Sequence, residues 1–174
     1  MKIQIPDYIQ VLIDLLNQNG YSAYVVGGAI RNALLELPIH DYDLTTDATP
    51  QEMLQVFSNY RVFQTGIQHG TITVLSNKQP VEITTFRSES IYEDHRHPSG
   101  VLFSKSIEED CKRRDFTINA LCYNNNEGLI DFFGGVDDLH HKIIRCIGNP
   151  HERIDEDALR ILRALRFAGR LSFT

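Results

Sequence analysis

Two carboxylates that stand two positions apart, Asp41 and Asp43, are the first residues whose types and spacing could do chemistry. They lie in a segment, residues 41–45, that alternates polar and apolar residues as a half-buried strand does. Residues two apart on a strand project from one face, with their backbones about 7 Å apart. Two such carboxylates can share a pair of hard divalent cations, which activate a hydroxyl and stabilise a leaving phosphate. An exposed polar strand face without function is the alternative.

Two glycines, Gly27 and Gly28, precede this pair, between a β-prone run at residues 21–26 and a helical pattern at residues 29–37. Glycine tolerates unusual backbone angles and lets a ligand approach the backbone closely. Such a turn can hold a phosphate, and Arg31, one helical turn along, can hold another. A tight strand-to-helix connection is the alternative reading. Joined to the carboxylate pair downstream, the turn favours a site for a phosphorylated ligand.

The elements that would position these residues mix helices and strands. Apolar residues at helical spacing predict a helix over residues 7–18. Thr49, followed by Pro50 and Glu52, is typical of a capped helix start. The β-branched runs at residues 70–76 and 80–87 predict a hairpin. The order of elements indicates a small α+β domain with a mixed sheet flanked by helices.

The second half of the chain predicts a loop and then helices. Residues 88–106 are polar and contain Pro98 and Gly100, so we expect a mobile loop there. Residues 154–169 predict one amphipathic helix. At 100° per residue its apolar side chains share one sector, which we expect to be the buried face. That sector holds Ala158, Ile161, Leu162, Leu165, Ala168 and Gly169.

Bulk composition constrains the function only loosely. Net charge is −6, but residues 1–110 hold 7 Lys/Arg and 14 Asp/Glu, whereas residues 111–174 hold 10 and 9. An acidic first part argues only weakly against a nucleotide or RNA partner, because bound divalent cations would invert the local field. No apolar run approaches the ~20 residues that span a bilayer. The N-terminus lacks a signal-peptide core, so we expect a cytoplasmic protein without a membrane partner.

The cysteines Cys111, Cys122 and Cys146 are odd in number and widely spaced. This spacing fits neither a zinc site nor a disulfide framework, so we expect buried free thiols.

The glycine turn (Gly-Gly-Ala-Ile-Arg) and the carboxylate segment (Asp-Tyr-Asp-Leu-Thr-Thr) together resemble the head motif of class II tRNA nucleotidyltransferases and bacterial poly(A) polymerases. The resemblance implies a polymerase β-like nucleotidyltransferase head. It also implies that Asp41 and Asp43 bind two Mg²⁺ ions and catalyse nucleotidyl transfer, while Gly28 and Arg31 bind the triphosphate. Asn32 stands where the family usually has Asp, and we expect a local structural effect. Glu82 is either a third metal ligand or an ordinary strand residue.

Two further segments extend the resemblance. Residues 108–120 resemble the family's second motif, which implies that Arg114 and Asp115 bind the nucleotide. Residues 153–167 resemble its neck motif, which reads the incoming base through Asp157 and Arg160. An ionised Asp only accepts hydrogen bonds and an Arg only donates them. That pair suits cytosine and adenine, whose pairing edges place an amine beside an unprotonated nitrogen. A surface ion pair is the alternative. Arg163 and Arg166 would be secondary nucleotide contacts.

The same family resemblance divides the chain into parts. It implies a catalytic head at residues 1–140 and the start of a helical neck at residues 141–174, with base recognition at about 154–169. The family's helical body and tail are absent from this sequence. Residues 131–139 resemble a third, structural motif that couples head to neck, and residues 92–98 resemble the flexible loop of CCA-adding members.

The function implied is addition of CMP and AMP, from CTP and ATP, to the 3′ end of tRNA. Three relatives stay as alternatives: an A-adding enzyme, a CC-adding enzyme and a poly(A) polymerase. The alternative from another class is a nucleotide- or RNA-binding module that has kept the fold without catalysis.

Overall fold

The computed structural model describes residues 2–88 and 101–174, through which one seven-stranded sheet runs. Its spatial order is β3-β4-β5-β2-β1-β6-β7, and all neighbours are antiparallel except β2 and β5, which are parallel. The mixed sheet with flanking helices agrees with the α+β class predicted from the sequence. The strands are β1 (Ala23–Val26), β2 (Asp43–Thr46), β3 (Arg61–Phe63), β4 (Thr71–Ser76), β5 (Gln79–Thr85), β6 (Cys122–Asn124) and β7 (Gly128–Ile130).

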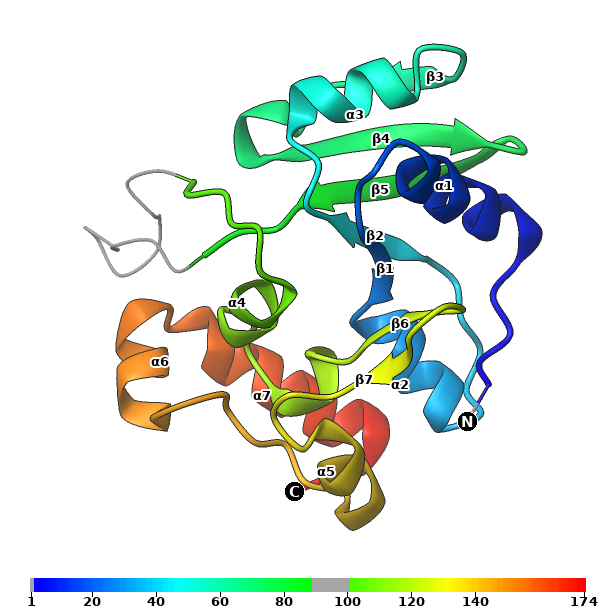
Figure 1. Ribbon diagram of the computed structural model, residues 1–174. Coiled ribbons are helices and arrows are strands. Elements are labelled where there is room, and N and C mark those ends of the chain that lie inside the picture. Colours follow the sequence, from blue (N-terminus) through cyan, green and yellow to red (C-terminus); the bar gives the residue numbers. More distant parts are fainter. Residues whose placement is uncertain (1, 89–100) are drawn as a thin grey trace.

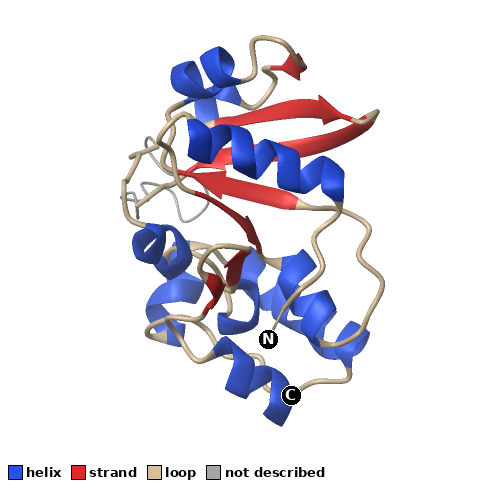
Figure 2. Cartoon of the chain, turned by 45° about the vertical axis from the view of Figure 1, so that its right-hand side comes forward, coloured by secondary structure: helices blue, strands red, loops and turns tan. Residues whose placement is uncertain are grey.

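Helices cover the sheet and continue past its β7 end (Figure 1). Helices α1 and α3 contact each other and β4, whereas α5, α6 and α7 gather at the opposite end of the molecule (Figure 2). No helix in the described ranges is long and apolar enough to cross a bilayer. The helices are α1 (Asp7–Gln18), α2 (Gly28–Leu34), α3 (Pro50–Val56), α4 (Ile107–Lys112), α5 (Gly135–His141), α6 (Pro150–Glu156) and α7 (Leu159–Leu171), with 3₁₀ turns η1 (Ile67–His69) and η2 (Thr117–Asn119).

The N-terminal elements follow their local sequence signals. Helix α1 has the predicted bounds and buries its apolar stripe in the main core. Helix α3 begins with the expected capping box: the Thr49 hydroxyl accepts a hydrogen bond from the Glu52 N–H, and the Glu52 carboxylate accepts one from the Thr49 N–H at 2.7 Å. The predicted hairpin is β4–β5, and its turn residues Asn77 and Lys78 have φ of 48° and 64°.

The centre of the sheet brings the glycine turn beside the carboxylate segment. Strand β1 ends at Val26, which pairs with Asp43 at the start of β2. Gly27 then turns the chain into α2 at φ 69° and ψ −127°, a backbone conformation that residues other than glycine rarely adopt. The antiparallel register of β1 and β2 therefore fixes the distance between the turn and Asp43.

The single helix predicted over residues 154–169 is wrong, because the structure has two helices, α6 and α7, separated at Asp157. Asp157 has extended backbone angles, φ −148° and ψ 99°. Its carboxylate accepts a hydrogen bond from the backbone N–H of Leu159 at 3.0 Å. An aspartate that captures a backbone N–H in this way competes with helical hydrogen bonds, so the helix ends and a new one begins.

The face of α7 that was expected to be buried is exposed instead. Ile161, Leu162 and Leu165 are 46, 62 and 64% exposed. The helix turns Arg160 and Phe167 toward the head, and Phe167 packs edge-to-face on buried Phe116 with ring centroids 5.9 Å apart. The head surface that faces α7 contains charged groups such as Asp115 and Arg31, so the helix packs against it with its polar side rather than with its apolar face.

The three cysteines are free thiols, of which Cys111 and Cys122 are buried and Cys146 is half-buried. The expectation of buried thiols is therefore confirmed for the first two. Their sulfur atoms lie 3.1 Å apart in a small apolar cluster separate from the main core.

The predicted loop at residues 88–106 falls partly outside the described residues, and the motif at residues 92–98 falls there entirely. The two flanking segments that are described pair with each other. The Ser88 N–H donates to the Leu102 carbonyl at 3.0 Å, and the Ser104 N–H donates to the Phe86 carbonyl at 2.8 Å.

The third motif is a structural joint between α5 and η2. The Asp131 carboxylate accepts hydrogen bonds from the N–H groups of Gly135 and Val136, both at 2.9 Å, and so caps α5. Gly135 packs directly against the backbone of Thr117, where an added Cβ would overlap the carbonyl oxygen. Only glycine lets α5 approach η2 this closely.

Gly135→Ala should lower the free energy of unfolding by about 1–3 kcal/mol, because the new methyl group must push α5 away from η2. Urea denaturation measures the change. The matched control is Gly169→Ala, a helical site with open space around its Cβ. There the change should stabilise the chain by about 0.5–1 kcal/mol. Equal stability of the two variants would contradict the close-approach argument.

Candidate active site

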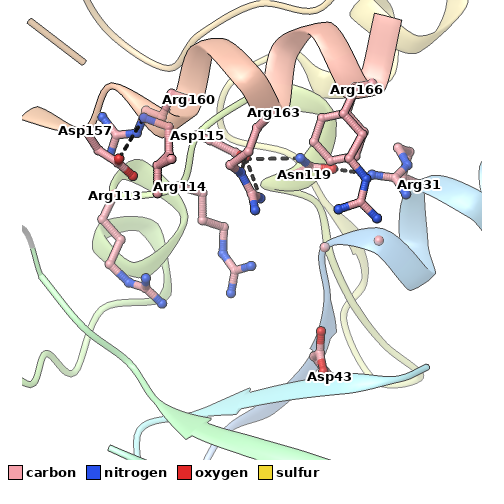
Figure 3. A pocket seen from close by; sticks show the side chains of 14 residues that line it. Arg31, Asp43, Arg113, Arg114, Asp115, Asn119, Asp157, Arg160, Arg163 and Arg166 are labelled. Atoms are coloured by element: carbon pink, nitrogen blue, oxygen red, sulfur yellow. Dashed lines mark hydrogen bonds and ion pairs between the residues drawn. The ribbon is translucent and has the colours of Figure 1, made fainter. Parts of the chain in front are cut away.

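A cavity of about 590 Å³ opens between the sheet and α7 (Figure 3). It gathers residues from α2, β2, η2, α7 and the segment between α4 and η2, which are far apart in the sequence. Among the sequence-predicted site residues, those lining it are Gly28, Arg31, Asp43, Arg114, Asp115, Asp157, Arg160, Arg163 and Arg166. Asp41 lines an adjoining cavity that shares Asp43, whereas Glu82 lines neither of the two.

Asp43 lies on the floor of this cavity (Figure 3). The strand predicted over residues 41–45 begins only at Asp43, so Asp41 lies two residues before it. Asp43 pairs in register with Glu82 on the parallel strand β5. Burial raises the pKa of Asp43 above its ordinary value, and the charges of Glu82 and Asp41 raise it further, while Arg114 opposes them. Three negative charges therefore crowd this part of the sheet, and a bound cation would relieve their repulsion.

The carboxylates fit one class of metal site. Among residues 2–88 and 101–174, no cluster of three or more His, Cys, Asp or Glu side chains could enclose a metal ion by itself. Mg²⁺ is usually held by one or two carboxylates together with substrate phosphates and water. Asp41 and Asp43 are suited to this arrangement, in which the substrate completes the coordination.

Asp110 on α4 is fully buried and organises the arginines of the cavity wall. Its carboxylate accepts hydrogen bonds from Arg113 Nε at 2.8 Å and Nη2 at 2.7 Å, and from Arg114 Nη2 at 3.0 Å. It also accepts from the Arg87 N–H at 3.1 Å and from the Thr45 hydroxyl at 3.3 Å. Because Thr45 lies on β2, this one carboxylate connects the arginines to the strand that carries Asp43.

Asp110 is a residue that the sequence analysis missed. Burial alone would raise the pKa of Asp110, but the charges of Arg114 and Arg113, and their hydrogen bonds, hold it below its ordinary value of 3.8. The available signal was its spacing, because Asp110 precedes the two arginines by three and four positions on a helix, where side chains meet.

Arg31 is a buried cation held by neutral groups. Its guanidinium donates to the amide oxygen of Asn119 at 2.6 Å and to that of Asn32 at 2.9 Å, and it lies 5.0 Å from the centre of the Phe167 ring. Asn32 also donates to the Pro38 carbonyl at 2.9 Å, so it fixes both Arg31 and the following loop. The local effect expected of Asn32 is thus to orient Arg31 without neutralising it.

Asp115 joins the head to α7. Arg163 donates to its carboxylate from Nε and Nη2, both at 2.7 Å, and the Asn119 amide donates to it at 3.1 Å. Asn119 therefore links Arg31 to Asp115 in one hydrogen-bonded chain. Asp115 and Arg163, both predicted nucleotide contacts, pair with each other at the cavity wall.

Asp157 and Arg160 line the other end of the cavity. The Arg160 N–H donates to the Asp157 carbonyl at 3.1 Å, but the two side chains do not pair with each other. Arg160 is 5% exposed and donates to Glu156 at 2.8 Å and to the Arg153 carbonyl at 2.5 Å. Asp157 uses one oxygen to cap Leu159. The alternative prediction of a surface ion pair between Asp157 and Arg160 is therefore wrong, because Arg160 forms its ion pair with Glu156 instead.

Arg153 on α6 is a second residue that the sequence analysis missed as a positioning group. It is buried and donates from Nη2 to the carbonyls of Arg113 at 2.7 Å and Arg114 at 3.0 Å. It also pairs with Glu156 at 2.8 Å. These contacts attach α6 to the end of α4, so the arginines of the wall are held from both sides.

Comparison with known proteins agrees with this architecture. The family model described as the poly A polymerase head domain matches residues 23–145. A CCA-adding enzyme of Enterococcus faecalis is 52% identical over 158 residues, which cover 91% of this chain and 38% of that protein. The chain thus spans about two fifths of the length of the curated relatives it matches.

Solved structures show the same fold. The structure of a Bacillus stearothermophilus CCA-adding enzyme in complex with CTP has a TM-score of 0.86 and 40% identity, covering 98% of this chain and 41% of that one. A tRNA nucleotidyltransferase complexed with a primer tRNA and an incoming ATP analog has a TM-score of 0.74 and 35% identity, covering 93% and 45%. The mixed sheet and its helices are therefore a polymerase β-like nucleotidyltransferase head.

Asp110→Asn should lower the free energy of unfolding at pH 7 by about 3–5 kcal/mol, because it removes the buried charge that pairs with two arginines. The folded-state pKa of Asp110 is depressed, so this stabilisation is fully present above the unfolded-state pKa and is lost as pH falls through the folded-state pKa. The difference between the two proteins should therefore be constant above about pH 5 and shrink below it.

Chemical denaturation across this pH range measures the effect. Glu108→Gln, on the exposed side of the same helix, is the matched control and should change stability by less than about 0.5 kcal/mol. If Asp110→Asn and Glu108→Gln had the same free energy of unfolding at pH 7, the ion pairs of Asp110 with Arg113 and Arg114 would not stabilise the fold as described.

Proposed function

The chain belongs to the poly(A) polymerase head domain family, and on that premise we propose that it is the catalytic part of an enzyme that adds CMP and AMP to the 3′ end of tRNA. The observation that carries the proposal is the shared cavity. One space is lined by the carboxylate Asp43, by arginines suited to phosphates, and by Asp157 and Arg160 at the other end. The named relatives are CCA-adding enzymes, which supports CTP, ATP and tRNA as partners.

The carboxylates define where chemistry takes place. The nucleotidyltransferase family generally uses divalent metal ions. In the proposal Asp41 and Asp43 would hold two Mg²⁺ ions, and the bound metal would supply activation of the attacking hydroxyl and charge neutralisation at the leaving phosphates. The tRNA 3′-hydroxyl attacks the α-phosphate in line and pyrophosphate leaves. Glu82, in register with Asp43, supplies negative charge beside it.

The arginines supply binding and charge stabilisation. Arg114 and Arg31 face the space above Asp43, where guanidinium groups bind phosphate oxygens more strongly than neutral donors do. Gly28 gives the phosphates access to the backbone of α2. Positioning and preorganised charge are the main sources of rate enhancement in phosphoryl transfer. Arg163 and Arg166 complete the wall along α7, with Asp115 holding Arg163.

Base selection is assigned to Asp157 and Arg160. Asp157 caps Leu159 with one carboxylate oxygen and lines the cavity, so its other oxygen can accept a hydrogen bond from an exocyclic amine. Arg160 is fixed by Glu156 and can donate to the neighbouring ring nitrogen. Uracil and guanine would present a carbonyl to Asp157 and an N–H to Arg160, which leaves both groups unsatisfied at about 1–3 kcal/mol each.

The proposed division into a head at residues 1–140 and a neck from residue 141 rests on this arrangement. The carboxylates and phosphate-binding groups belong to the first part, and the base-reading pair belongs to the second. Since tRNA processing uses cytoplasmic substrates, we place the protein in the cytoplasm.

Asp43→Asn should reduce incorporation of labelled CMP into tRNA that lacks its CCA end by at least about 10²–10³-fold, because it removes a metal-binding charge at the reacting phosphate. The assay uses CTP, ATP and Mg²⁺. Asp14→Asn on α1 is the control and should retain full incorporation. Undiminished incorporation by Asp43→Asn would overturn the assignment of the carboxylates.

The unsubstituted chain should bind CTP and ATP with Mg²⁺ and reject GTP and UTP when measured by calorimetry. Asp157→Asn keeps an oxygen for the Leu159 cap but adds a donor, so the preference for CTP over UTP should fall about ten-fold or more. Binding of ATP alone would indicate an A-adding enzyme or a poly(A) polymerase. Equal binding of all four nucleotides would contradict the role of Asp157 and Arg160.

A further inference from the structure

A second cavity of about 210 Å³ adjoins the first on the far side of Arg31 and Asp43. The two cavities share Gly28, Arg31 and Asp43 in their linings. The second one is otherwise bounded by residues outside the base-reading end, among them His40 and Asp41 before β2 and Arg170 near the end of α7. Figure 3 shows Arg31 and Asp43 at the end of the first cavity that lies away from Asp157, so the second cavity continues the space beyond them.

Two guanidinium groups, Arg31 and Arg170, and two carboxylates, Asp41 and Asp43, line this second cavity. In the proposed function the carboxylates are covered by metal ions, and the guanidinium groups then favour an anion. Among the described residues, Arg31 hydrogen-bonds to two amide oxygens and to no carboxylate. The nearby carboxylate Asp115 already pairs with Arg163. A buried guanidinium with neutral partners is costly unless an ion of opposite charge binds beside it.

Arg170 strengthens this positive field. Burial lowers the pKa of Arg31, and the charge of Arg170 is the next largest cause, ahead of that of Arg163. Two guanidinium groups thus repel each other across the second cavity. An anion placed between them would turn that repulsion into attraction on both sides.

The geometry of α7 relates the two cavities. Arg163 and Arg170 are seven residues apart, so they lie on nearly the same side of the helix. Arg160 in the first turn and Arg170 in the last are separated by ten residues, a rise of about 15 Å. Helix α7 therefore presents the proposed base-reading residue Arg160 at one end. At the other end it presents Arg170, whose guanidinium has no hydrogen bond or ion pair to any residue that the structure describes. The span between them is comparable with an extended nucleoside triphosphate.

We propose that the second cavity receives the terminal phosphate of the bound nucleoside triphosphate, and that Arg170 binds it. Helix α7 then contacts the base through Arg160 and the terminal phosphate through Arg170. A diphosphate lacks the phosphate that reaches Arg170, so it binds more weakly than a triphosphate. The inference rests on the proposed function and extends it to a residue outside the motifs that identify the family. His40 borders the same space, where its ring can donate a hydrogen bond.

The test compares affinities of the full 174-residue chain for CTP, CDP and inorganic pyrophosphate, measured by calorimetry at fixed Mg²⁺. Arg170→Gln should weaken CTP and pyrophosphate binding about ten-fold, as expected for loss of one charge-assisted hydrogen bond, and should change CDP binding less than about two-fold. Arg61→Gln, on distant β3, is the matched control and should leave all three affinities unchanged.

The outcomes separate this inference from the proposed function. If the unsubstituted chain binds neither CTP nor ATP, both are overturned. If it binds CTP and Arg170→Gln weakens CTP and CDP by the same factor, or weakens neither, only the assignment of Arg170 to the terminal phosphate is overturned.

Discussion

A buried carboxylate is costly unless hydrogen bonds and opposite charges surround it. Asp110 satisfies this condition because it contacts groups from three parts of the chain: the two arginines that follow α4, the N–H of Arg87 after β5, and the hydroxyl of Thr45 on β2. Since Thr45 lies two residues after Asp43, the carboxylate that holds the arginines also fixes their position relative to the strand that carries Asp43. The positive wall and the negative floor of the cavity are therefore built as one unit.

Helix α7 completes the cavity through polar contacts rather than through its apolar stripe. Arg163 reaches Asp115, while Phe167 lies between Phe116 and the guanidinium of Arg31. The break at Asp157 lets α7 take a direction of its own after α6. It also leaves an acidic side chain at the cavity edge, beside the buried Arg160.

Local signals in the sequence predicted much of the fold. The helix over residues 7–18 and the Thr49 capping box depend on neighbours within a few positions, so both were confirmed. The break at Asp157 was missed because the spacing of apolar residues continues through it. That spacing carries no information about the Asp157 side chain, which accepts a hydrogen bond from the backbone N–H of Leu159. The parallel pairing of β2 with β5 and the contact of Asp110 with Thr45, 65 residues away, depend on the tertiary structure. The resemblance to family motifs identified most residues that line the cavity, but it did not identify Asp110 and Arg153, which hold them in position.

The in-register pairing of Asp43 with Glu82 has a thermodynamic consequence. Folding brings these carboxylates, and Asp41 nearby, closer than they are in the unfolded chain, so their repulsion is a property of the folded state alone. A divalent cation that binds there and not to the unfolded chain raises stability by RT ln(1 + [L]/Kd), or about 2.7 kcal/mol at a hundred times Kd. If Asp41 and Asp43 hold a cation as proposed, the melting temperature of the protein would depend on the free concentration of that ion, and the chain would be least stable when the ion is scarce.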